Sequence, residues 1–140
     1  MKELLIEAKT ENLDAVLQFV SEQLENTDCP VKAQTQIAIA VEEVFVNIAH
    51  YAYNPETGGA EIRVTVGDEA AIEFKDKGKP YNPLEQDDPD VAAGAEEREI
   101  GGLGIYMVKN IMDAVEYRRE GGKNVLLIKK AFKAKYYPGA

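Results

Sequence analysis

Residues 37–49 read Ile-Ala-Ile-Ala-Val-Glu-Glu-Val-Phe-Val-Asn-Ile-Ala. This stretch is apolar throughout except at Glu42, Glu43 and Asn47. A helix turns by about 100° per residue, so side chains three and four positions apart share one side. The apolar residues that form such a stripe are Ile37, Val41, Val44 and Ile48. We therefore expect a long helix, from about Pro30 to Tyr53, that packs one side on a core.

Two polar side chains, Glu43 and Asn47, lie one turn apart on the same face of this helix. No Lys or Arg occurs between Lys32 and Arg63, so the carboxylate has no cationic neighbour along the helix. A half-buried, unpaired carboxylate is costly unless it meets a cation or a water network. The pair therefore either faces solvent or points at a metal-bound ligand, and Mg²⁺ is the hard ion that takes such oxygen ligands. His50 follows on roughly the same side and is interpreted as structural, since no nucleophile is tied to it.

The other elements follow from the spacing of apolar residues. Alternation predicts strands over residues 2–8, 61–66, 70–75, 114–119 and 124–132. An earlier helix carries apolar residues at positions 13, 16, 17, 20 and 24 and is capped by Thr10 or Asn12. A further helix follows residue 101. Because hairpins join the later strands, we expect an α+β fold, a two-layer α/β sandwich with a largely antiparallel mixed sheet and helices on one face.

Two glycine segments stand at the ends of predicted elements. Asp76-Lys77-Gly78-Lys79-Pro80 closes a strand. It is either a plain turn, where Asp-x-Gly is common, or a place where Asp76 accepts a ligand's hydrogen bond beside Gly78. Gly101-Gly102-Leu103-Gly104 opens a helix, and it is either a flexible loop or a set of amides that hold a phosphate. No Gly-Lys-Ser/Thr follows, so the segment is not a Walker loop.

The order of these three motifs resembles the GHKL ATP-binding superfamily, which includes histidine-kinase catalytic domains, gyrase-type ATPases and mismatch-repair ATPases. The shared pattern is a helix with Glu-x-x-x-Asn, a strand ending in Asp-x-Gly-x-Pro, and Gly-Gly-x-Gly opening a helix. The resemblance is nearest to the bacterial anti-sigma-factor serine kinases, through residues 42–53, 75–83 and 101–105. It extends from the first strand to about Phe132 and implies a histidine-kinase-like ATPase fold.

The resemblance implies a role for each residue of the helix and strand motifs. Glu43 would be the general base that takes the proton of an attacking hydroxyl. Asn47 would coordinate the Mg²⁺ that bridges the phosphates of ATP. Asp76 would bind the adenine amino group, and Gly78 would shape the base pocket.

The glycine-rich helix start and the loop before it would handle the phosphates. Gly102 and Gly104, with nearby amides, would hold phosphate oxygens. Arg98 would approach the γ-phosphate or a partner protein. One residue departs from the superfamily, because Asn124 stands where Thr is frequent near the base, although Asn retains a donor and an acceptor.

The implied function is that of an ATP-dependent serine/threonine protein kinase. It would act as an anti-sigma factor, binding a sigma factor and phosphorylating the anti-sigma-factor antagonist. Three alternatives remain: an ATP-gated protein-binding regulator with little or no transfer, a histidine-kinase-type catalytic domain, and a structural domain with incidental glycines. A histidine-kinase-type domain is disfavoured because 140 residues leave no room for a phosphoacceptor helix pair. The resemblance leaves a homodimer open.

Composition narrows the classes of partner and compartment. The 140 residues carry 16 Lys and Arg against 25 Asp and Glu, a formal net charge of −9, which disfavours direct binding of nucleic acid or an anionic membrane. The single cysteine, Cys29, excludes an internal disulfide and a Cys-based metal site. The first residues are charged too early for a signal peptide, and no apolar run approaches the roughly 18 residues of a membrane span. We therefore expect a cytoplasmic protein.

The predicted organisation is one domain over residues 1–133 and a C-terminal tail over residues 134–140. A lid loop is expected at about residues 83–100, where periodicity is lost. Within residues 84–99 there are seven acids and one base, Arg98, so most of the negative charge falls there. Such a lid would repel a triphosphate unless its acids point outward or meet metal or a basic partner.

Overall fold

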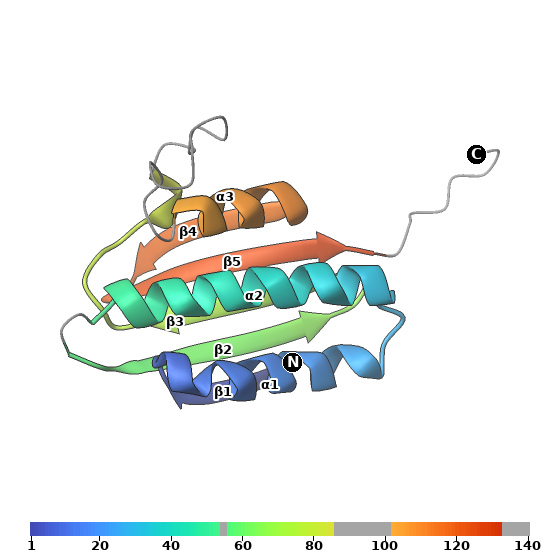
Figure 1. Ribbon diagram of the computed structural model, residues 1–140, viewed down its shortest axis with the longest axis horizontal. Coiled ribbons are helices and arrows are strands. Elements are labelled where there is room, and N and C mark those ends of the chain that lie inside the picture. The colour runs from blue at the N-terminus through green and yellow to red at the C-terminus, as the bar shows by residue number, and fades with distance from the viewer. Residues whose placement is uncertain (54–55, 86–101, 133–140) are drawn as a thin grey trace.

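The computed structural model describes residues 1–53, 56–85 and 102–132, which form a sheet covered on one face by helices (Figure 1). The five strands lie in the order β1-β2-β3-β5-β4, and each pairing among the described residues is antiparallel. The strands are β1 (Lys2–Glu7), β2 (Gly59–Val66), β3 (Glu69–Asp76), β4 (Ala114–Glu120) and β5 (Lys123–Ala131). The helices are η1 (Thr10–Asn12), α1 (Leu13–Glu25), α2 (Val31–Tyr51), η2 (Pro83–Glu85) and α3 (Gly102–Ile111). The predicted α+β sandwich is confirmed.

Alternate residues of the central strands point into the helix layer and form the core. Ile62 of β2 lies opposite Phe74 of β3, which in turn lies opposite Leu126 of β5. These side chains are buried in one cluster with Ile37 and Val44 of the α2 stripe. Burial of such a side chain contributes about 1.5–3 kcal/mol, so this stripe fixes α2 across the middle of the sheet (Figure 1).

The same alternation places a polar pair on the helix side at one end of the sheet. Asp76 ends β3 and pairs in register with Asn124 of β5, and both are 6% exposed. They are the buried polar residues of the described part of the chain. Buried polar groups need hydrogen-bond partners, so this end of the sheet is where a functional site is expected.

The cap predicted for the first helix is wrong. Asn12 occupies the N-cap of α1 without a side-chain cap hydrogen bond, and its backbone has φ −94° and ψ 3°. An N-cap side chain reaches the helix amides from an extended backbone, whereas Asn12 is the last residue of the 3₁₀ turn η1. Its amide Nδ2 instead donates to the carbonyl oxygen of Glu7 at 2.9 Å. The hydroxyl of Thr10 donates to Glu11 and caps nothing.

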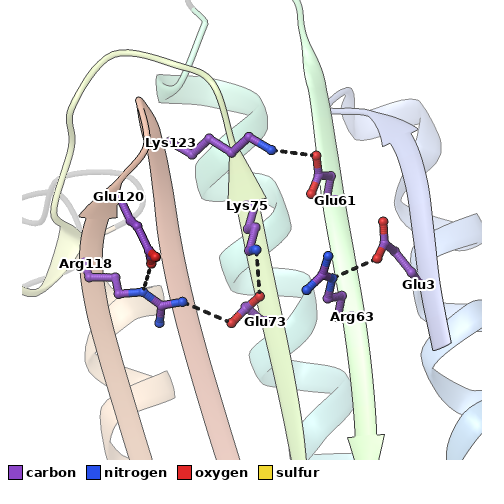
Figure 2. A network of polar contacts seen from close by, with 8 residues as sticks. All are labelled: Glu3, Glu61, Arg63, Glu73, Lys75, Arg118, Glu120 and Lys123. Atoms are coloured by element: carbon purple, nitrogen blue, oxygen red, sulfur yellow. Dashed lines mark hydrogen bonds and ion pairs between the residues drawn. The ribbon is translucent and has the colours of Figure 1, made fainter. Parts of the chain in front are cut away.

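The face of the sheet away from the helices is covered with charged pairs (Figure 2). Arg63 contacts Glu3 at 2.8 Å, and Lys123 contacts Glu61 at 3.0 Å. Glu73 lies 3.5 Å from both Lys75 and Arg118. Ion pairs exposed to solvent stabilise a fold by no more than about 1 kcal/mol each. The charged pairs on this face therefore contribute more to solubility than to stability.

Two predicted regions fall partly or wholly outside the described residues. The predicted lid at 83–100 is described only through residue 85, and the predicted tail at 134–140 is not described. Among the described helices, none combines the length and apolar character that crossing a membrane requires.

Candidate functional site

Glu43 is a half-buried carboxylate on the side of α2 that faces α3. Among the described residues its side chain has no hydrogen bond or ion pair. Burial raises the pKa of Glu43, and the neighbouring carboxylate of Glu42 raises it further. A carboxylate with a raised pKa is a better proton acceptor, which is the property that a general base requires.

Gly104, the third residue of α3, lies directly against this carboxylate. A Cβ atom built on Gly104 would be 2.0 Å from Oε2 of Glu43 and 2.9 Å from its carboxyl carbon. Any residue other than glycine would therefore push the carboxylate or the helix away. The Gly-Gly-x-Gly segment thus makes room for Glu43 at the N-terminus of α3, where backbone amides also favour negative charge.

Asp76 and Gly78 form a tight turn at the end of β3. The amide of Gly78 donates to Oδ1 of Asp76 at 2.9 Å. A Cβ atom on Gly78 would be 2.3 Å from the carbonyl oxygen of Ala52, which accepts a hydrogen bond from the amide of Lys79 at 3.0 Å. Gly78 is therefore required for the turn to pack against the end of α2.

Asn124 joins Asp76 to three other parts of the site. Its Nδ2 donates to Oδ1 of Asp76 and to the carbonyl oxygen of Lys79, both at 2.9 Å. Its Oδ1 accepts from the amide of Tyr81 at 3.2 Å and from the hydroxyl of Tyr117 at 2.5 Å. Both ends of the carboxamide are thus engaged by the protein itself.

The charge of Asp76 is set by opposing influences. Burial is the largest influence and raises the pKa of Asp76. The hydrogen bonds from Asn124 and from the Gly78 amide, and the guanidinium of Arg119, lower it. Arg119 is held in place because its Nη1 donates to the carbonyl oxygen of Gly78 at 2.9 Å.

Tyr53 supports the same turn from the α2 side. Its hydroxyl accepts from the amide of Lys77 at 2.8 Å and donates to the carbonyl oxygen of Gly59 at 2.7 Å. Its ring packs on Gly58, where a Cβ atom would be 2.3 Å from the ring. The start of β2 and the end of β3 are thereby tied to the residues that follow α2.

A small cavity brings the α2 and β3 motifs together. Its volume is about 30 Å³, and its polar lining includes Asn47, Asp76 and Asn124. The rest of its lining is Val44, Ile48, Ala52, Tyr81, Pro83, Tyr117 and Leu126. A cavity of this size holds a water molecule rather than an aromatic ring, so a ring-shaped ligand enters only when a lining segment moves. The ring of Tyr81 stacks on that of Tyr51, with centroids 5.5 Å apart.

A divalent metal fits this site only together with a ligand that brings its own oxygens. Among the described residues, no group of three or more His, Cys, Asp or Glu side chains could hold a metal ion. Asn47 lines the cavity with a carboxamide that makes no hydrogen bond to other described residues. Mg²⁺ commonly takes one or two protein oxygens plus phosphate oxygens and water, which is a set that Asn47 can join.

Most of the predicted site residues meet in the structure. Glu43 meets Gly104, Asn47 and Asp76 line one cavity, and Gly78 bonds to Asp76. Gly102 begins α3. Arg98 lies outside the described residues.

The sequence did not point to Tyr53, Tyr117 or Arg119. Tyr117 and Arg119 reach the site only through the pairing of β4 with β5, where Arg119 lies opposite Asn124. The register of that hairpin, set by its Gly121-Gly122 turn, is the feature that could have indicated them.

Two curated protein kinases are similar in sequence to this chain. The serine/threonine-protein kinase BtrW of Bordetella bronchiseptica is 26% identical, over 66% of this chain and 66% of that protein. The serine-protein kinase RsbW of Bacillus velezensis is 29% identical, over 66% of this chain and 62% of that protein. The chain therefore spans slightly less than two thirds of the curated relatives that it matches.

A solved structure shows a likeness of fold, and a family model gives the family. The solved structure of the Acinetobacter baumannii histidine kinase AdeS superposes with a TM-score of 0.51 at 12% identity, over 96% of this chain and 70% of that one, which is a likeness of fold. The model of the histidine kinase-like ATPase domain matches residues 6–130. The chain therefore belongs to the histidine kinase-like ATPase domain family.

Proposed function

We propose that the chain is an ATP-dependent serine/threonine protein kinase that uses Glu43 as its general base. Family membership supports use of ATP, and the names of BtrW and RsbW support transfer to a protein serine or threonine. The observation that carries the proposal is the contact of Glu43 with Gly104. This contact places the carboxylate of Glu43, which has a raised pKa and no partner among the described residues, beside the N-terminus of α3. The N-terminus of a helix can hold phosphates.

The chemistry needs positioning more than covalent help from the protein. Ionised Glu43 takes the proton of the acceptor hydroxyl as its oxygen attacks the γ-phosphorus. The bond between that phosphorus and the β–γ bridging oxygen breaks, and ADP leaves with the electron pair. The amides of Gly102 and Gly104 hold phosphate oxygens, because the first amides of α3 have no partners within the helix.

The adenine base and the Mg²⁺ ion would bind at the cavity. Asp76 accepts a hydrogen bond from the adenine amino group, and Gly78 keeps the turn close to the base. Asn47 would be the protein ligand of Mg²⁺, which, when bound, offsets the negative charge of the phosphates. Arg98 would act on the γ-phosphate or on a partner.

The proposed partners are a sigma factor and its antagonist, and the acceptor is a serine or threonine of the antagonist. The chain would sequester the former and inactivate the latter by phosphorylation, acting in the cytoplasm without contacting nucleic acid. We also propose one domain over residues 1–133 with a lid at about 83–100 and a tail at 134–140. The net charge of −9 agrees with protein rather than nucleic-acid partners.

The test is transfer of label from γ-labelled ATP to a small candidate antagonist protein that carries Ser or Thr and is chosen from the genes neighbouring this one. Label is expected on Ser or Thr of the antagonist with Mg²⁺ and not with EDTA. Asn47→Ala should weaken ATP binding in Mg²⁺ by about tenfold and change binding in EDTA little. ATP binding without any transfer would replace the kinase by an ATP-gated binding regulator. No ATP binding at millimolar concentration would contradict a nucleotide site altogether.

A further inference from the structure

We propose that Asn124 is a positioning residue that holds one oxygen of Asp76 and leaves the other free for the base. This inference rests on the proposed nucleotide site and concerns how Asp76 is prepared for it. Asn124 is 6% exposed, and its carboxamide can make four hydrogen bonds, two as donor and two as acceptor. All four go to the protein: to Asp76, Lys79, Tyr81 and Tyr117.

Because its hydrogen-bonding capacity is filled, Asn124 has nothing to offer a base directly. The sequence alone suggested that Asn124 would keep a donor and an acceptor for the ligand, and the structure directs both inward. The residue therefore acts through Asp76. It links Asp76 to the segment that follows Gly78 and, through Tyr117, to β4.

The consequence for Asp76 is an asymmetry between its two oxygens. Oδ1 accepts from the amide of Gly78 and from Nδ2 of Asn124, each at 2.9 Å. Among the described residues, none donates to Oδ2. Asp76 lines the cavity, so a buried carboxylate with one filled and one open oxygen is presented to it. An open anionic acceptor selects a base edge that carries an N–H donor, such as an exocyclic amine.

The asymmetry depends on the direction of one hydrogen bond, from Asn124 to Asp76. Asn124→Asp keeps the shape but replaces the donor by an oxygen at the same 2.9 Å. Two carboxylates this close cannot both ionise readily, so the pair keeps one shared proton until the pH is raised. When the two carboxyl groups share a proton, they form a hydrogen bond and Asp76 stays in position. When that proton is lost at high pH, the two carboxylates repel each other and Asp76 is displaced.

Asn124→Ala has the opposite effect on the titration of Asp76. It removes a hydrogen bond that lowers the pKa of Asp76 and leaves burial, which raises that pKa. Asp76 is then protonated at a higher pH than in the wild type and loses its acceptor as the pH falls. The other titratable groups that surround Asp76 include Arg119, Tyr53, Tyr81, Tyr117, Glu61, Lys75, Lys77 and Lys123.

The experiment is calorimetric titration of ATP into the full chain at pH 5.5, 7 and 9, with each variant compared with the wild type at the same pH. The ratio of the variant's affinity to the wild-type affinity at one pH is independent of the titration of ATP itself. Asn124→Asp should lose at least about tenfold more affinity at pH 9 than at pH 5.5, and Asn124→Ala should lose more at pH 5.5 than at pH 9. Glu120→Gln, an exposed change outside the cavity, is the control and should follow the wild-type pH profile.

A structural role without positioning would lower affinity by a factor that does not change with pH. That result in both variants, or wild-type affinity in both, would overturn the proposal. Should Asn124→Asp fail to fold by circular dichroism, the slope of Asn124→Ala decides alone. Wild-type protein that binds no ATP would instead contradict the proposed function, so the two failures are distinguished.

Discussion

Gly104 leaves so little space beside Glu43 that a methyl group in place of its hydrogen would lie 2.0 Å from Oε2. The Glu43 carboxylate is therefore positioned by the absence of a side chain on the neighbouring helix. Under the proposed mechanism, this gives the glycine a second purpose besides the approach of phosphate to the backbone. The proposed proton acceptor and the N-terminus of α3 pack against each other, so a change in one displaces the other.

Gly104→Ala should reduce phosphoryl transfer more than ATP binding. The added methyl group forces Glu43 out of position, and a misplacement of about 1 Å can cost on the order of 100-fold in rate. Affinity for ATP should fall by less than about tenfold, because the base turn at Asp76 is untouched. Gly67→Ala is the matched control, since a Cβ atom there meets nothing within 4 Å. Equal rates for Gly104→Ala and Gly67→Ala would show that the contact is not needed.

Glu43→Gln should stabilise the fold at neutral pH. The pKa of Glu43 is raised from 4.5 in the folded chain, so above that raised pKa its charge is less favourable in the folded than in the unfolded state. Below 4.5 both states bind the proton and the penalty disappears. Urea unfolding at pH 8 should show a gain of no more than about 1 kcal/mol after solvent screening, shrinking toward pH 4. A loss of stability at pH 8 would mean that the carboxylate has a stabilising partner.

The raised pKa of Glu43 also sets a pH dependence for transfer. Only the ionised carboxylate accepts a proton, so the wild-type rate should fall as the pH drops through that pKa. Single-turnover rates with saturating ATP between pH 5 and 8 measure this limb. Glu42→Gln removes a neighbouring charge that raises the pKa, so it should move the limb to lower pH without abolishing transfer. If the acidic side of the pH–rate profile stays at the same pH in Glu42→Gln, a group other than Glu43 controls the rate.

Gly78→Ala should destabilise the chain and weaken nucleotide binding together. Its Cβ atom would be 2.3 Å from the carbonyl oxygen of Ala52, a backbone atom that cannot move without disturbing the end of α2. Overpacking of this kind costs about 1–3 kcal/mol. Chemical denaturation with and without ATP measures both effects. Unchanged stability would indicate that the turn is looser than its packing implies.

Asp76→Asn should lose ATP affinity while keeping the fold. An Asn oxygen can still accept from Gly78 and Asn124, but the open position then carries an amide donor that faces the donor of the base. Leaving such groups unpaired is expected to cost about 10- to 100-fold in affinity. Equilibrium titration of ATP measures the loss, with the exposed change Glu120→Gln as control. Wild-type affinity in Asp76→Asn would remove Asp76 from the base site.

The sequence was sufficient to predict the layers and the strand pairing by hairpins, because each is written in a local pattern, and the roles of the site residues stay predictions. The stripe through Ile37 and Val44 predicts α2, and the spacing of Glu43 and Asn47 predicts that they share a face. What Gly104 does for Glu43 could not be predicted, because it depends on how closely α3 packs on α2.

The partners of Asn124 were equally out of reach, since they come from three separate segments whose register and turns must be known first. The wrong prediction of a helix cap at Asn12 also arose because tertiary contacts cannot be read from a local pattern. A local preference for capping gave way to a 3₁₀ turn and to a hydrogen bond with the carbonyl of Glu7. Local patterns therefore indicated the candidate residues, and tertiary packing decided which contacts each of their polar atoms makes.

Glu43→Gln and its neighbour Glu42→Gln are compared in single-turnover transfer from γ-labelled ATP, with ATP binding measured on the same samples, to test Glu43 as the general base. Both changes remove one negative charge from adjacent residues of α2, but only Glu43 lies against Gly104. We predict that Glu43→Gln loses transfer by at least about 100-fold at unchanged ATP affinity, whereas Glu42→Gln keeps both within about threefold. Transfer by Glu43→Gln at the wild-type rate would contradict the assignment of Glu43 as the general base.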